Sequence, residues 1–131
     1  MKSLAIFASG SGTNAENIIR YFSNSEFFKV AIVLSNKQGA GVHERAKKLN
    51  VPSISFSKEA FESGEAILDI LKTYQIDFIV LAGFMSKIAD KLLAAYPHKI
   101  INIHPALLPK FGGKGMYGMH VHRAVIASGE T

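Results

Sequence analysis

The sequence has no cysteine and no long hydrophobic run. Without cysteine it can form no disulfide, thiolate nucleophile or cysteine-based metal site, which is neutral to mildly favourable for a reducing, cytoplasmic setting. No apolar run approaches the ~20 residues of a membrane-spanning helix. The apolar run at residues 4–8 is shorter than the core of a signal peptide and is interpreted as a buried strand.

The sequence also lacks a basic run interleaved with aromatic residues. Its formal net charge is +5, a balance that suits nucleic acid or small anionic substrates. However, the lysines and arginines are scattered, and the densest cluster is only "ERAKKL" at residues 44–49. The pattern therefore favours an ordinary solvated helix face over a nucleic-acid surface.

What the chain does contain is an alternation of apolar runs and helix-like segments. It has 131 residues, of which 48% are hydrophobic, enough for one core and a single domain over residues 1–131. Because the apolar runs are hydrophobic on both faces, they predict an α/β fold with a doubly wound, mostly parallel sheet and helices on both of its faces. The expected strands span residues 4–9, 28–35, 51–56, 77–84 and 99–104. The expected helices span residues 14–22, 42–50, 65–74, 86–96 and 120–128.

Ligands of such sheets bind beyond the carboxyl ends of the strands, which directs attention to the segments that follow them. After the first strand, "SGSGTN" at residues 9–14 combines glycines with the start of a helix, a pattern that can direct backbone N–H groups at a phosphate. Ala15 replaces the third glycine of the dinucleotide fingerprint, and Ser35 and Asn36 stand where its acidic residue would be. The loop therefore predicts a single phosphate rather than NAD. The alternative is a tight turn capped by Thr13 or Asn14.

Two polar side chains interrupt the last apolar run, "KIINIHPALLP" at residues 99–109. Asn102 and His104 are two positions apart on a strand, so they point to the same side. An amide can stabilise a developing oxyanion, and an imidazole can move a proton near neutral pH. No serine or cysteine nucleophile stands beside them, which favours direct attack of a substrate's own nucleophile on a carbonyl. The alternative, a buried histidine with a capping asparagine, is equally compatible with the pattern.

Histidines also occur as a pair, His120 and His122. In a helix, residues two apart point to different sides, and no acidic residue nearby completes a ligand set. No metal site is expected from them.

The loop and the strand end together resemble the phosphoribosylglycinamide formyltransferase family of folate-dependent formyltransferases. The matching segments are "FASGSGTN" after the first strand, "VLSN" and "LAGFM" at the ends of two others, and "INIHPALLPKF". "NIHPALLP" is specific to folate-dependent formyl-transfer domains, and "SGSGTN" narrows the choice to the ribonucleotide enzymes. The resemblance implies a Rossmann-like formyltransferase fold.

The resemblance also implies a reaction and a site. The formyl group of 10-formyltetrahydrofolate is transferred to the amine of glycinamide ribonucleotide, in de novo purine biosynthesis and without a metal. Asn102 polarises the formyl oxygen and His104 acts in proton transfer. The substrate phosphate is held by Gly12, Thr13 and Asn14. The folate pocket is lined, together with Asn102, by Met85, Ser86, Lys87 and Ile88.

The resemblance carries further expectations. The partners are small molecules, not nucleic acid or a membrane, and the protein is a cytoplasmic monomer or homodimer. The family's third catalytic residue is an aspartate well downstream of the asparagine–histidine motif, so we expect that it and the C-terminal strands lie outside this sequence, which ends at Thr131. Residues 110–119 form a longer loop than the shortest in the family. For His120 and His122, a structural role at a helix start is favoured over catalysis.

Other interpretations stay open. Formyltetrahydrofolate deformylase, a hydrolase, shares the motif but usually carries an N-terminal regulatory domain, whereas the first strand here begins near residue 3. Methionyl-tRNA formyltransferases have a different first loop and typically "NVHGSLLP" in place of "NIHPALLP". A third possibility is a phosphate-binding fragment that performs no chemistry.

Overall fold

The computed structural model describes residues 1–85 and 87–103, which contain five strands and five helices. Strands and helices alternate as predicted, except that two helices lie between the third and fourth strands. The helix expected over residues 120–128 lies outside the described residues. In chain order the elements are β1 (Lys2–Phe7), α1 (Thr13–Phe22), β2 (Phe28–Ser35), α2 (Val42–Lys48), β3 (Ser53–Ser55), α3 (Lys58–Ser63), α4 (Glu65–Thr73), β4 (Phe78–Ala82), α5 (Asp90–Ala95) and β5 (Ile100–Ile103).

All of the described strand pairs are parallel, and the strand order is β3-β2-β1-β4-β5. The chain therefore builds outward from β1 in one direction through β2 and β3, and in the other direction through β4 and β5. The direction reverses between β1 and β4. In open α/β sheets, the crevice at this switch point, beyond the carboxyl ends of the strands, is where ligands bind.

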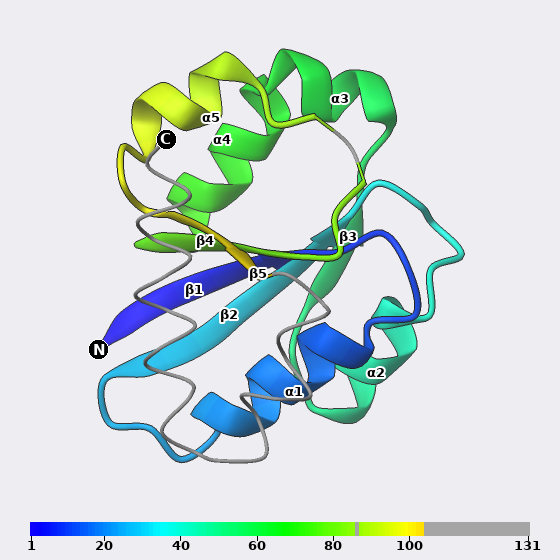
Figure 1. Ribbon diagram of the computed structural model, residues 1–131, viewed down its shortest axis with the longest axis vertical. Helices are drawn as coiled ribbons and strands as arrows, with labels where there is room; N and C mark the ends of the chain where they lie inside the picture. The colour runs from blue at the N-terminus through cyan, green and yellow to red at the C-terminus, as the bar shows by residue number, and fades with distance from the viewer. Residues whose placement is uncertain (86, 104–131) are drawn as a thin grey trace.

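Helices cover both faces of the sheet, α1 and α2 on one side and α3, α4 and α5 on the other (Figure 1). The central strand β1 serves both cores, because its side chains alternate between the two faces. Leu4 and Ile6 join the core under α1 and α2, whereas Ala5 and Phe7 join the core under α3, α4 and α5. Burial on both faces explains the continuous apolar run of β1.

Two helical segments differ from the prediction. The helix expected over residues 86–96 is limited to α5, because Ala89 is extended at ψ 146° and is buried in the core together with half-buried Ile88. The short helix α3 was not predicted. Its start is capped by the Ser57 hydroxyl, which accepts a hydrogen bond from the Ala60 N–H at 3.1 Å, and its apolar side chain Phe61 is fully buried.

Candidate functional site

The loop between β1 and α1 depends on a glycine at its last position. Gly12 has a φ of +84°, in the left-handed region that residues with a Cβ rarely adopt. A Cβ atom on Gly12 would also lie 2.6 Å from Val42 of α2. Gly12 therefore allows both the sharp turn into α1 and the close packing of α2 against the loop.

The first turn of α1 leaves backbone donors uncapped. Thr13 and Asn14 are its first two residues, and no side chain caps the described helix start. The cap by Thr13 or Asn14 considered from sequence is therefore wrong. The N–H groups of these two residues and of Ala15 have no preceding helical turn to bond. Together with the positive end of the helix dipole, they form an arrangement that suits an anion.

Ser9 joins three loops at the switch point. Its side chain is 3% exposed, and its hydroxyl donates to Asn36 Oδ1 at 2.6 Å after β2 and accepts from the Met85 N–H at 2.7 Å after β4. The Ser9 N–H also donates to the Gly83 carbonyl at 3.3 Å. Sequence reasoning missed this role, and the only local signal is a serine directly after a buried strand.

The segment after β4 contains the residues predicted to line a folate pocket. Met85 is 80% exposed and Lys87 is exposed, whereas Ile88 packs on the core under α5. Phe84 packs between the rings of Phe7 and Phe61, with ring centroids 5.3 and 4.8 Å away. The phenylalanine anchors the segment and leaves Met85 at the surface. Ser86 lies outside the described residues.

Asn102 lies near the end of β5 with an exposed side chain. The register places it level with Leu81 of β4, which in turn is level with Phe7 of β1. Asn102 is therefore at the same edge of the sheet as the Ser9 and Gly83 loops. Its neighbours Ile101 and Ile103 are buried under α1 and α2, so strand alternation puts Asn102 on the opposite face.

The remaining predicted residues of this site cannot be placed beside Asn102. His104, His120 and His122 lie outside the described residues, so the pairing of Asn102 with His104 stays a prediction. Within the described ranges, no group of three histidine, cysteine or acidic residues could hold a metal ion. No helix in the same ranges is long and apolar enough to cross a membrane.

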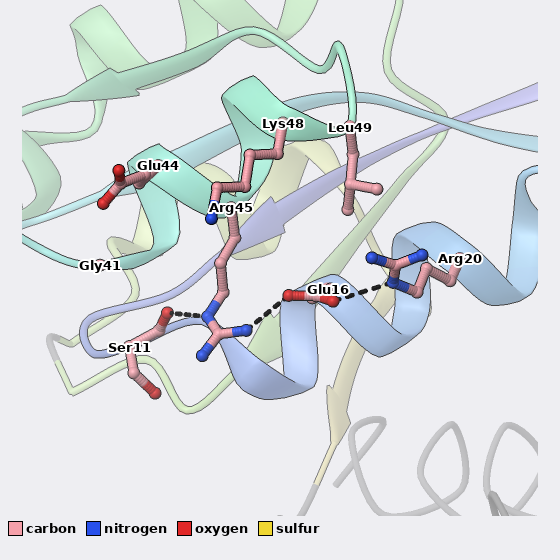
Figure 2. A pocket seen from close by; sticks show the side chains of 8 residues that line it. All are labelled: Ser11, Glu16, Arg20, Gly41, Glu44, Arg45, Lys48 and Leu49. Carbon is pink, nitrogen blue, oxygen red and sulfur yellow. Dashed lines mark hydrogen bonds and ion pairs between the residues drawn. The ribbon is translucent and has the colours of Figure 1, made fainter.

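An ionic network supports the loop from the side of α1 and α2. Arg45 of α2 donates from Nε to the Ser11 carbonyl at 2.7 Å and from Nη1 to Glu16 Oε1, while Arg20 donates to Glu16 Oε2 at 2.8 Å (Figure 2). The hydrogen bonds from Arg20 and then Arg45 lower the pKa of Glu16 below its usual 4.5. A cavity of about 450 Å³ lies here, and Ser11 and Gly41 contribute to its lining. Asn102 is not among the described residues that line this cavity.

The fold and this edge define a doubly wound α/β protein with a glycine-containing loop and an uncapped helix start at the switch point of its sheet. Residues 2–131 match the family model described as formyl transferase, and the chain belongs to that family. The resemblance and the fold class expected from sequence are confirmed.

Individual relatives agree with this assignment. The chloroplastic phosphoribosylglycinamide formyltransferase of Arabidopsis thaliana is 40% identical over 134 residues, which cover 98% of this chain and 46% of the relative. The phosphoribosylglycinamide formyltransferase of Bacillus subtilis is 38% identical over 136 residues, which cover 100% of this chain and 70% of that protein. The crystal structure of glycinamide ribonucleotide transformylase 1 from Geobacillus kaustophilus has a TM-score of 0.74 at 44% identity and covers 95% of this chain and 68% of that one. The chain spans about half the length of the plant relatives.

Proposed function

We propose that this chain is the part of a phosphoribosylglycinamide formyltransferase that carries the ribonucleotide loop and the asparagine–histidine motif. The complete enzyme transfers a formyl group from 10-formyltetrahydrofolate to the amine of glycinamide ribonucleotide. The observation that carries the proposal is the uncapped start of α1 behind Gly12, at the switch point of a formyl transferase fold. The names of the relatives support the choice of substrates.

The phosphate of the ribonucleotide binds at Gly12, Thr13 and Asn14. The support is geometric, since the first N–H groups of α1 point out of the helix and lack intrahelical partners. Thr13 is exposed and Asn14 is half-buried, so both side chains can add donors. A phosphate there gains hydrogen bonds and the favourable helix dipole together.

The folate binds along residues 85–88 and near Asn102. In the described part of this segment, Met85 offers an exposed apolar side chain beside the Ser9 hydrogen bond, and Lys87 is also exposed. With Ser86, Ile88 and Asn102, they contribute to a pocket that the rest of the protein completes. This assignment rests on the family resemblance and on the position of the segment at the carboxyl edge of the sheet.

The transfer itself uses Asn102 and His104. The substrate amine attacks the formyl carbon, a C–N bond forms, and the formyl oxygen becomes an oxyanion to which the Asn102 amide donates. His104 assists removal of the amine proton, the bond from carbon to the folate nitrogen breaks, and that nitrogen regains a proton. Neither step needs a metal.

The other expectations follow the same family. The enzyme acts on small molecules, needs no nucleic acid or membrane, and works as a monomer or homodimer. We place it in the cytoplasm, although relatives named chloroplastic also exist. We place residues 1–131 in a single domain.

The test compares glycinamide ribonucleotide with the same compound lacking its phosphate, as ligands of this chain in isothermal titration calorimetry. Binding of the ribonucleotide with clear loss of affinity for the dephosphorylated compound supports the proposal. Equal affinity for the two, or no binding of either, contradicts the assignment of the phosphate to the loop.

A further inference from the structure

Helix α2 holds the loop through two consecutive carbonyl groups. The Val42 N–H donates to the Gly10 carbonyl at 3.2 Å, and Arg45 Nε donates to the Ser11 carbonyl at 2.7 Å. The chain is closely packed there, since a Cβ on Gly41 would lie 3.2 Å from Ser11. Both carbonyls therefore point toward α2.

The direction of these carbonyls sets the direction of the next N–H groups. In a trans peptide, the carbonyl oxygen and the following N–H point in opposite directions, and the described chain has no cis peptide bond. With the Gly10 and Ser11 carbonyls turned toward α2, the N–H groups of Ser11 and Gly12 point away from it. The Gly12 carbonyl accepts from the Glu16 N–H at 2.8 Å, along α1, so the Thr13 N–H points out of the helix start.

The geometry points to Arg45 as a positioning residue for the phosphate of the ribonucleotide. By binding the Ser11 carbonyl, its guanidinium turns the Ser11–Gly12 peptide so that the Gly12 N–H joins those of α1 as a phosphate donor. This inference deepens the proposed function and rests on the phosphate site given there.

Glu16 holds the guanidinium in this orientation. One carboxylate oxygen accepts from Arg45 and the other accepts from Arg20, which approaches from the next turn of α1 (Figure 2). The Arg45 side chain is 38% exposed and Glu16 is 22% exposed, so this pair is partly shielded from water. Arg45 thus spans three elements: its own helix, the loop and α1.

The positioning role of Arg45 depends on the fixed directions of its guanidinium N–H donors, and not on its charge alone. The planar guanidinium offers donors in fixed directions, so one side chain can bind the Ser11 carbonyl and the Glu16 carboxylate together. A lysine ammonium has the same charge, but it is a single point at the end of a flexible stem. It cannot hold both partners in this geometry.

Arg20 supplies a matched control. It binds the same Glu16 carboxylate, but its side chain is 62% exposed, and within the described residues its guanidinium bonds to Glu16 and not to the loop. Arg20→Met therefore removes a cation and one Glu16 bond while leaving the Ser11 carbonyl held. Arg45→Met removes the contact with the loop together with the charge, and Arg45→Lys removes the contact while keeping the charge.

The experiment measures the affinity of each variant for glycinamide ribonucleotide by calorimetry, with 10-formyltetrahydrofolate as a second ligand wherever the wild type binds it. We expect Arg45→Met and Arg45→Lys each to weaken ribonucleotide binding about tenfold, the scale of one charge-assisted hydrogen bond. The affinity of Arg20→Met for the ribonucleotide should stay within about twofold of the wild-type value, because Arg20 forms an exposed ion pair. Affinity for the folate should not change. Hydrogen exchange in the ribonucleotide complex gives a second measurement. Faster exchange of the Gly12 amide in the Arg45 variants than in the wild type would show that this N–H no longer points at the phosphate.

Each other outcome is informative. Wild-type affinity in Arg45→Lys overturns the positioning role and leaves only a charge effect. Equal losses in Arg20→Met and Arg45→Met overturn it in favour of a general effect of cations near Glu16. If Arg45→Met does not fold, as judged by circular dichroism, Arg45→Lys decides the question. Failure of the wild-type protein to bind the ribonucleotide contradicts the proposed phosphate site itself, a result distinct from failure of the variants alone.

Discussion

The backbone N–H of Met85 donates a hydrogen bond of 2.7 Å to the hydroxyl of Ser9, although the two residues are 76 positions apart in the chain. This bond joins the loop predicted to hold a phosphate to the segment predicted to line a folate pocket. The same hydroxyl donates to Asn36, so the loops after β1, β2 and β4 are held together by one buried side chain. The two expected binding regions are therefore parts of one connected edge.

Ser9→Ala should destabilise the protein. It removes the buried hydroxyl that joins Asn36 Oδ1 to the Met85 N–H, and the loss of these two hydrogen bonds should cost about 1–3 kcal/mol. Ser63→Ala is the control, because its exposed hydroxyl donates to the carbonyl of Ala60 within the same helix, and it should change stability by less than about 0.5 kcal/mol. Urea unfolding measures the free energy of unfolding of both variants. Equal stability of the two variants would show that the Ser9 bridge contributes nothing.

Gly12→Ala should also destabilise, by about 2 kcal/mol or more. The added methyl group meets Val42 at 2.6 Å, and the residue must adopt a positive φ, which itself costs about 1–3 kcal/mol. Gly39→Ala is the matched variant, since no atom lies within 4 Å of its added Cβ and its φ is not positive. Thermal unfolding of the two proteins compares them, and a Gly12→Ala protein as stable as Gly39→Ala contradicts the tight approach of α2.

Asn102→Ala should lower the rate of formyl transfer by the complete enzyme at least about 10²-fold, the loss typical of one oxyanion donor. Because the side chain is exposed at the end of β5, the fold should be retained. Lys99→Ala, exposed just before the same strand, is the control and should keep its rate. His104→Ala should show a loss of similar size, as expected for a proton-transfer group. Single-turnover rates test both, and a near-wild-type rate rejects the role of the residue concerned.

The Glu16 network should make stability depend on acid pH. The folded protein holds the pKa of Glu16 below its usual 4.5, so folding favours the ionised carboxylate. Its contribution is present above that usual pKa and disappears as the pH falls through the lowered folded value. The difference in melting temperature between wild type and Glu16→Gln should therefore be steady near neutral pH and shrink in acid. A difference that is constant or grows as the pH falls contradicts the ion pairs.

The main elements could be predicted because each leaves a local pattern. Buried strands such as β1 are apolar on both faces, and α4 places Ile67 and Leu71 four apart on its buried side. Helix α3 was missed because it spans only six residues and buries one large side chain, which is too short for periodicity. The extra turn was predicted before α5 because Ile88 and Ala89 are apolar, as a helix face would be. Both instead pack on the core ahead of the helix, with Ala89 extended.

The site was predictable where it depends on residue type and not where it depends on long-range contact. Gly12 and Asn102 stand out in the sequence, the first by its place before a helix and the second as an amide in an apolar strand. In contrast, the bond from Arg45 to the Ser11 carbonyl joins residues that are 34 positions apart in the chain. The bond from Met85 to Ser9 joins residues that are 76 positions apart. Neither leaves a local signal, because each depends on how the helices pack on the sheet.

The most direct test of the central claim traces the formyl carbon. The complete enzyme is mixed with glycinamide ribonucleotide and 10-formyltetrahydrofolate labelled with carbon-13 in the formyl group, and the products are followed by NMR. The account predicts that the label appears as an amide on the ribonucleotide. Release of the label as free formate, independent of the ribonucleotide, would identify a deformylase instead, and an unchanged substrate would contradict the assigned reaction altogether.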